Sequence, residues 1–115
     1  MKNKEYRSLQ KMIDYIDKAL RYTDGCTFQS FSENEEKVDA TIFAISQIGE
    51  LVKNISKATM EKYPYIEWVI IKNLRNKIVH DYEGIKLNFI WDIVTTDIVQ
   101  LRSDLKKILE HETEN

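Results

Sequence analysis

The chain has 115 residues, of which 43% are hydrophobic and 31% charged, and its formal net charge is −2. A chain of this length is typical of one domain around one hydrophobic core, so we expect a single domain over residues 1–115. The small negative charge excludes binding of nucleic acid through overall charge, so any such contact needs a local basic patch.

Membrane and metal-centred classes of protein are also disfavoured. No stretch approaches the roughly 20 apolar residues that span a bilayer, and the first segment, MKNKEYRSLQKMIDYIDKAL, has polar residues throughout. We therefore expect a cytoplasmic protein without membrane contact.

Cys26 is the only cysteine, which excludes an internal disulfide and paired-cysteine zinc sites, and no HExxH motif or glycine-rich phosphate loop occurs. We expect neither a metal nor another cofactor.

Apolar residues recur at helical spacing in four blocks, and none shows the sustained alternation that is typical of a strand. The first block, from Leu9 to Leu20, predicts a surface helix. Turn residues follow at Asp24 and Gly25. Ser32 and Glu35 then have the spacing of a capping box, which predicts that a second helix begins there and continues to about residue 55.

The third helix is expected to begin near Pro64 or Tyr65, because proline disfavours helical geometry in the preceding residue and suits a first helical turn. It should continue to about His80, and Gly84 provides a stop. The fourth helix is expected from Leu87 to about residue 109. These blocks predict an all-α, up-and-down bundle of four to five helices.

The third helix ends in LRNKIVHDYEGI, residues 74–85, which places chemically active side chains on a helix that should bury apolar surface. Asn76 and His80 share a stripe of this helix. Arg75 and His80 are about 140° apart on an ideal helix, so their side chains do not meet automatically. They approach only if the helix frays or bends near His80, or if a second copy of the chain supplies a facing pair.

This set of side chains suits phosphodiester chemistry. Histidine exchanges a proton near neutral pH, and arginine offers a fork of donors to phosphate oxygens. RNA cleavage by its own 2′-hydroxyl requires two proton transfers and stabilisation of a crowded phosphorane, and none of these steps demands a metal. A single histidine, His80, cannot easily perform both proton transfers. A twofold axis near His80 would bring two histidines and two arginines to one cleft.

Simpler interpretations of the same residues remain open. His80 can act as a helix C-terminal cap or a solvated side chain, and Arg75 can pair with Glu67 or Glu83 on the surface. Lys72 and Lys77 are candidate RNA contacts or ordinary solvated lysines. The tryptophans, Trp68 and Trp91, belong to the core or a dimer interface before they are base-stacking platforms, and His111 in the polar tail is expected to be inert. Gly49, inside the second helix, indicates close helix approach, and its neighbour Glu50 can face the cleft.

The segment RNKIVHDY, residues 75–82, has an arginine, four residues, a histidine, one residue and a tyrosine. With IGELVKNIS, the YP pair, Trp68, YEGI and FIWDIV in their order and spacing, the chain resembles the HEPN superfamily, and specifically the HepT-like toxins of toxin–antitoxin pairs. The likeness covers nearly the whole chain after the first helix. It implies a HEPN-like helical domain.

The resemblance also implies a function. In HepT-like toxins the motif belongs to a metal-independent endoribonuclease, so Arg75 and His80 would be catalytic and Asn76 and Tyr82 would support the site. Two motifs would meet across a homodimer, with RNA as the substrate. Such toxins are typically encoded beside a minimal nucleotidyltransferase antitoxin that can transfer AMP to the motif tyrosine, here Tyr82.

We therefore expect the toxin component of a toxin–antitoxin pair, silenced by AMP transfer to Tyr82. Adenylyl adds charge and bulk beside the cleft, which would repel RNA phosphate. The main alternative is a non-catalytic helical module that docks a nucleotidyltransferase or a nucleotide. A helical scaffold dimer without chemistry is the third interpretation.

Overall fold

The computed structural model describes residues 1–114, and their side chains with the exception of those of Tyr82 and Glu114. The described part of the chain consists of helices and turns, without a strand, so the expected all-α fold is confirmed. The elements in order are α1 (Asn3–Thr23), α2 (Phe28–Ser32), α3 (Glu35–Leu51), η1 (Val52–Asn54), α4 (Lys57–Lys62), α5 (Trp68–His80), η2 (Tyr82–Gly84), α6 (Leu87–Asp92), the π-helical turn η3 (Ile93–Asp97) and α7 (Ile98–Glu114).

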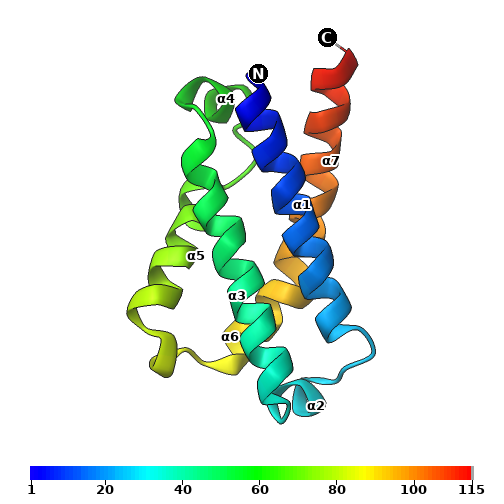
Figure 1. Cartoon of the computed structure of the whole chain (residues 1–115), viewed down its shortest axis with the longest axis vertical. Coiled ribbons are helices and arrows are strands. Elements are labelled where there is room, and N and C mark those ends of the chain that lie inside the picture. The colour runs from blue at the N-terminus through cyan, green and yellow to red at the C-terminus, as the bar shows by residue number, and fades with distance from the viewer. Residues whose placement is uncertain (115) are drawn as a thin grey trace.

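The long helices stand side by side (Figure 1). α1 packs against α3 and α7, and α5 packs mainly against the far side of α3, at the edge of the bundle. α4 closes the end that carries both termini, while α2 and α6 lie at the other end, where α5 also finishes (Figure 1). Leu9, Ile45, Ile90 and Leu105 are fully buried and come from different helices, so one apolar core joins the long elements.

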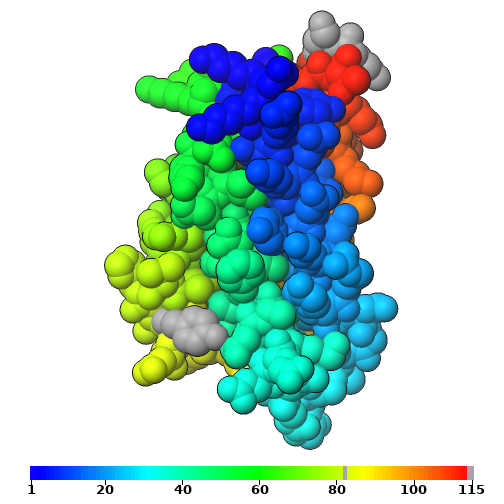
Figure 2. Space-filling view, in the orientation of Figure 1, coloured from blue at the N-terminus to red at the C-terminus, as the bar shows by residue number. Residues whose placement is uncertain are grey.

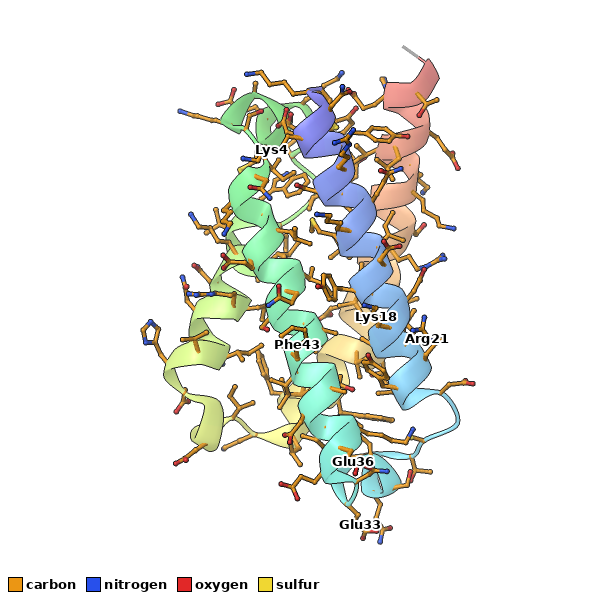
Figure 3. All side chains as sticks on the ribbon, in the orientation of Figure 1. Lys4, Lys18, Arg21, Glu33, Glu36 and Phe43 are labelled. Carbon is orange, nitrogen blue, oxygen red and sulfur yellow. The ribbon has the colours of Figure 1, made fainter. Side chains whose placement is uncertain are left out.

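The α1–α3 seam faces the viewer in Figures 2 and 3, and α1 and α3 make up most of that surface. Phe43, on α3, is 58% exposed, and its ring meets the edge of Tyr15 from α1 at 6.4 Å between centroids. Lys18, also on this face, lies over the Tyr15 ring at 5.0 Å (Figure 3). Aromatic and cation–π contacts therefore extend the buried core to the surface along this seam.

The start of α3 differs from the sequence prediction. The expected turn at Asp24 and Gly25 is present, with Gly25 at a φ of 73°. The capping box of Ser32 and Glu35 is wrong, because Ser32 ends the short helix α2 and its hydroxyl donates to the carbonyl of Phe28 at 2.8 Å. Asn34 caps α3 instead, accepting from the backbone N–H of Lys37 at 3.1 Å.

The third predicted helix also begins later than expected. Pro64 and Tyr65 lie in a turn, and α5 starts at Trp68. The carbonyl of Tyr63 accepts from the backbone N–H of Ile66 at 3.3 Å and from the Trp68 indole at 3.0 Å. The buried indole thus ties down the turn, and the position of Trp68 in the core is confirmed.

The fourth predicted block is an almost continuous helix interrupted by the π-helical turn between α6 and α7. A π turn holds more residues than an α turn. It therefore keeps Ile90, Val94 and Ile98, which are spaced by four residues, on the buried side. Trp91 is half-buried, and its ring lies against Phe31 of α2 at 5.3 Å between centroids. None of the described helices is both long and apolar enough to cross a bilayer.

A buried carboxylate fastens α1 to the start of α4. Glu5 is only 5% exposed, and it accepts from the backbone N–H of Ser56 at 2.7 Å and from the hydroxyl of Thr59 at 2.8 Å. Burial alone raises the pKa of this carboxyl, but the hydrogen bonds from Ser56, Thr59 and Lys2 outweigh it and lower the pKa to about 2. The ionised form is therefore the one that the fold stabilises.

Glu5→Gln should destabilise the protein at neutral pH by about 2–3 kcal/mol, because the amide replaces a carboxylate that accepts several hydrogen bonds. The folded-state pKa is depressed, so this stability is present above the ordinary carboxyl pKa and is lost as the pH falls toward 2. Urea denaturation of wild type and variant should give a difference that shrinks between about pH 5 and pH 2. Glu61→Gln, at an exposed position of α4, is the control and should show no such trend.

Candidate active site

The site is organised by a close crossing of α3 and α5 at Gly49. A Cβ atom added to Gly49 would lie 2.7 Å from the backbone oxygen of Ile71 and 2.9 Å from Cβ of Arg75. Only glycine allows the two backbones to approach this far, so the close approach predicted for Gly49 is confirmed. The contact places the residue after Gly49 beside the motif arginine.

Glu50 is the partner of Arg75. Its Oε2 lies 3.0 Å from Nε of Arg75, and its Oε1 is bonded by the ammonium group of Lys53. The surface partners considered from the sequence, Glu67 and Glu83, form no ion pair with Arg75 within the described residues. Glu50 and Arg75 are both half-buried, so the pair is partly shielded from solvent.

His80 is the last residue of α5 and is exposed. The helix stays regular to this point, because the backbone N–H of Asp81 still donates to the carbonyl of Lys77 at 3.0 Å. Arg75 and His80 therefore remain about 140° apart around the helix, and one chain does not bring them together. Fraying or bending near His80 was one of the two routes that the sequence left open, and α5 shows neither up to His80 itself.

Asn76 stands between the two motif residues on the solvent side of α5. It follows Arg75 by about 100° around the helix and precedes His80 by about 40°. Its Oδ1 accepts from Nη1 of Arg75 at 3.3 Å, which turns the guanidinium toward the exposed face. Lys72 is exposed on the same helix. Lys77 is also exposed, with its ammonium 4.0 Å from the centroid of the Phe89 ring.

The segment after α5 turns sharply through η2. A Cβ atom added to Gly84 would come into close contact with a carboxylate oxygen of Asp81, a side chain that can rotate aside. The Asp81 carboxylate is thus directed onto the Gly84 backbone. The backbone of Tyr82 begins η2, while the side chain of Tyr82 lies outside the described part of the structure.

Several apolar side chains of α5 are exposed. Val69 is 68% exposed and Val79 55% exposed, and Ile70 is 56% exposed at the rim of a groove of about 570 Å³. The groove lies between α5 and the η3–α7 segment, with Phe89 and Leu101 among its apolar walls. Among the described residues, no group of three or more His, Cys, Asp or Glu side chains is placed to hold a metal ion.

Comparison with known proteins identifies the family. The family model described as "Ribonuclease HepT-like" matches residues 12–110, which include α3, α5 and the whole motif. The chain belongs to the HepT-like ribonuclease family. This HEPN-superfamily assignment, expected from RNKIVHDY and its flanking segments, is confirmed.

Named relatives of this HepT-like chain cover most of its length. "Putative RNase MJ0127" of Methanocaldococcus jannaschii is 37% identical over 105 residues, 91% of this chain and 81% of the relative. "Probable ribonuclease HepT" of Thermococcus cleftensis is 28% identical over 108 residues, 94% of this chain and 98% of the relative. "Gamma-glutamylcyclotransferase and putative RNase MJ0434" of M. jannaschii is 31% identical over 107 residues, 93% of this chain but 48% of the relative. No solved structure matches significantly.

Gly49→Ala should lower the stability of this HepT-like protein by about 1–3 kcal/mol, because the added Cβ meets backbone atoms of α5 that cannot move aside cheaply. In an ordinary helix interior, alanine stabilises the helix by about 1 kcal/mol relative to glycine. A net loss of stability in Gly49→Ala would therefore come from the close contact between α3 and α5. Urea denaturation measures the change. Ser46→Ala, on the same helix, is the control, since its hydroxyl donates to the carbonyl of Phe43 within α3. Equal or greater stability of Gly49→Ala would contradict the tight crossing.

Proposed function

We propose that this HepT-like protein is the toxin of a toxin–antitoxin pair and acts in the cytoplasm as a metal-independent endoribonuclease. One observation carries the proposal: a chain of a ribonuclease family presents Arg75, Asn76 and His80 on the accessible turns of one helix. The arginine supplies positive charge, the asparagine can donate and accept hydrogen bonds, and the histidine transfers protons. RNA is the substrate that matches this chemistry.

The reaction is cleavage of RNA by its own 2′-hydroxyl. One imidazole takes the proton of the 2′-hydroxyl, whose oxygen attacks the adjacent phosphorus. A second, protonated imidazole gives its proton to the departing 5′-oxygen, so the products carry a 2′,3′-cyclic phosphate and a 5′-hydroxyl. The guanidinium of Arg75 stabilises the negative charge that accumulates on the phosphorane oxygens. No metal takes part in these steps.

The active form is a homodimer, because one chain supplies one motif histidine for two proton transfers. Arg75 and His80 also point to different sides of α5, which a facing copy of the helix compensates. The exposed valines, Val69 and Val79, and the neighbouring apolar groove support this arrangement, since a second copy would remove that surface from water. Lys72 and Lys77 lie on the same helix and are proposed to contact RNA phosphates.

A cognate minimal nucleotidyltransferase acts as the antitoxin and transfers AMP to Tyr82. The backbone of Tyr82 lies two residues after His80, at the mouth of the proposed cleft. An adenylyl group there adds a phosphate charge and a bulky base. RNA phosphates would be repelled and access to Arg75 and His80 blocked.

Arg75→Ala and His80→Ala should each lower cleavage of single-stranded RNA in metal-free buffer at least ~100-fold, because each removes a group that acts on the transition state. Subunit exchange of wild type with a large excess of His80→Ala should lower the activity of the wild-type subunits at least ~10-fold. Each mixed dimer retains a single His80 imidazole, which cannot perform both proton transfers. Gel analysis of labelled RNA measures cleavage, and circular dichroism checks that each variant is folded.

The outcomes separate the proposed function from its rivals. If wild-type protein free of AMP cuts no RNA, the endoribonuclease proposal is wrong. The protein is then a helical module that docks a nucleotidyltransferase or a nucleotide. Wild type that keeps its full activity after subunit exchange with excess His80→Ala contradicts a cleft shared between subunits. A large loss of stability in His80→Ala would indicate a structural role for this side chain.

Incubation with ATP and the nucleotidyltransferase encoded beside this protein should add the mass of one or more adenylyl groups to the wild-type chain and abolish RNA cleavage. Tyr82→Phe should gain no such mass, and its RNA cleavage should be the same before and after incubation, since it lacks the acceptor oxygen. Tyr65→Phe, at an exposed tyrosine of the turn before α5, is the matched control and should be modified like wild type. Intact-mass spectrometry measures the transfer. Unchanged modification of Tyr82→Phe would place the acceptor elsewhere.

A further inference from the structure

Glu50 contacts the motif arginine but belongs to a different helix. It follows Gly49, where α3 and α5 are closest, so its position relative to α5 is set by backbone packing. Its Oε2 lies 3.0 Å from Nε of Arg75, and its other oxygen is bonded by Lys53. A carboxylate anchored at both oxygens has little freedom to leave the arginine.

The contact decides which edge of the guanidinium remains available. Arginine has five N–H donors, and a phosphate can take either the Nε side or the terminal pair of nitrogens. In this structure the Glu50 carboxylate lies against the Nε side of the guanidinium as an ion-pair partner, and Nη1 donates to Asn76. Within the described side chains, the donors that remain are on Nη2 and on the second N–H of Nη1. A phosphate must therefore approach Arg75 end-on.

The charges of the cluster keep this arrangement compatible with an anionic substrate. The hydrogen bond from Lys53, opposed by desolvation and aided by the charges of Lys53 and Arg75, lowers the pKa of Glu50, so the carboxylate is ionised at neutral pH. Glu50, Lys53 and Arg75 together carry one net positive charge. The carboxylate therefore holds the guanidinium without making the cluster acidic.

We propose that Glu50 is a positioning residue for RNA cleavage, which presets the guanidinium of Arg75 for end-on contact with the phosphorane. The inference rests on the proposed endoribonuclease function. A preset donor needs no reorganisation when charge develops, and displacement of such a group by about 1 Å can lower a rate by about 100-fold. The rival explanation is a partly exposed ion pair with little effect, as most such pairs have.

The test compares Glu50→Ala, Glu50→Gln and Glu67→Ala with wild type. Glu67 immediately precedes α5, is exposed and forms no ion pair with Arg75 among the described residues, so it controls for loss of a nearby carboxylate. Steady-state cleavage of a single-stranded RNA oligonucleotide in metal-free buffer gives kcat and KM. Thermal denaturation gives the stability of each variant.

Glu50→Ala should lower kcat about 10- to 100-fold, because Arg75 must be oriented anew in each turnover. Its KM should be unchanged or lower, since one negative charge beside the RNA has been removed. Glu50→Gln keeps an acceptor for Nε and should restore part of kcat. Glu67→Ala should behave like wild type. The Nε–H NMR signal of Arg75 should exchange faster with water in Glu50→Ala, a readout that does not depend on turnover.

The outcomes are distinct. If wild type is active and Glu50→Ala retains kcat within about threefold of it, the positioning role is wrong and the ion pair is only structural. A fall in kcat explained by a lower melting temperature, with no change in exchange at Arg75, also overturns it. Wild type that cuts no RNA overturns the proposed function and this inference with it.

Discussion

The constraint on which the candidate site depends is the contact between the backbones of α3 and α5 at Gly49. Side-chain packing alone leaves helices some freedom to slide, but a backbone-to-backbone contact without an intervening Cβ permits little. The register of α5 on α3 is therefore fixed at the level of Ile71 and Arg75. The ion pair with Glu50 and the exposed position of Asn76 follow from this register.

The local spacing of apolar residues was sufficient to predict most of the fold. A long amphipathic helix repeats its signal over several turns, as α1 does, and burial then follows from the sequence period. Short helices such as α2 and α4 contain too few turns for the apolar spacing to be recognised in the sequence. The ends of helices were less predictable, because Ser32 and Pro64 each satisfy a local rule that a neighbouring contact overrides. Ser32 is part of α2 and Asn34 caps α3, while the Trp68 indole bonds the carbonyl of Tyr63 and stabilises the turn that contains Pro64.

The candidate site was predictable in composition but not in geometry. The residue types and their spacing identified Arg75, Asn76 and His80, because these depend on one helix and one motif. The partner of Arg75 comes from another helix, and only tertiary packing determines that Glu50, rather than Glu67, reaches it. Gly49 carried the one sequence signal for this contact, a glycine inside a helix where alanine would be favoured.

The arrangement of the chain ends bears on how this architecture can be extended. Both termini lie at the α4 end of the bundle, whereas α5 finishes at the opposite end (Figure 1). Polypeptide joined to either terminus would therefore emerge away from the motif and leave it uncovered. In the relative named "Gamma-glutamylcyclotransferase and putative RNase MJ0434", the matched region makes up 48% of the chain. The rest of that chain is long enough for a second domain. A fusion partner, natural or engineered, can thus be accommodated without rebuilding the helix that carries the chemistry.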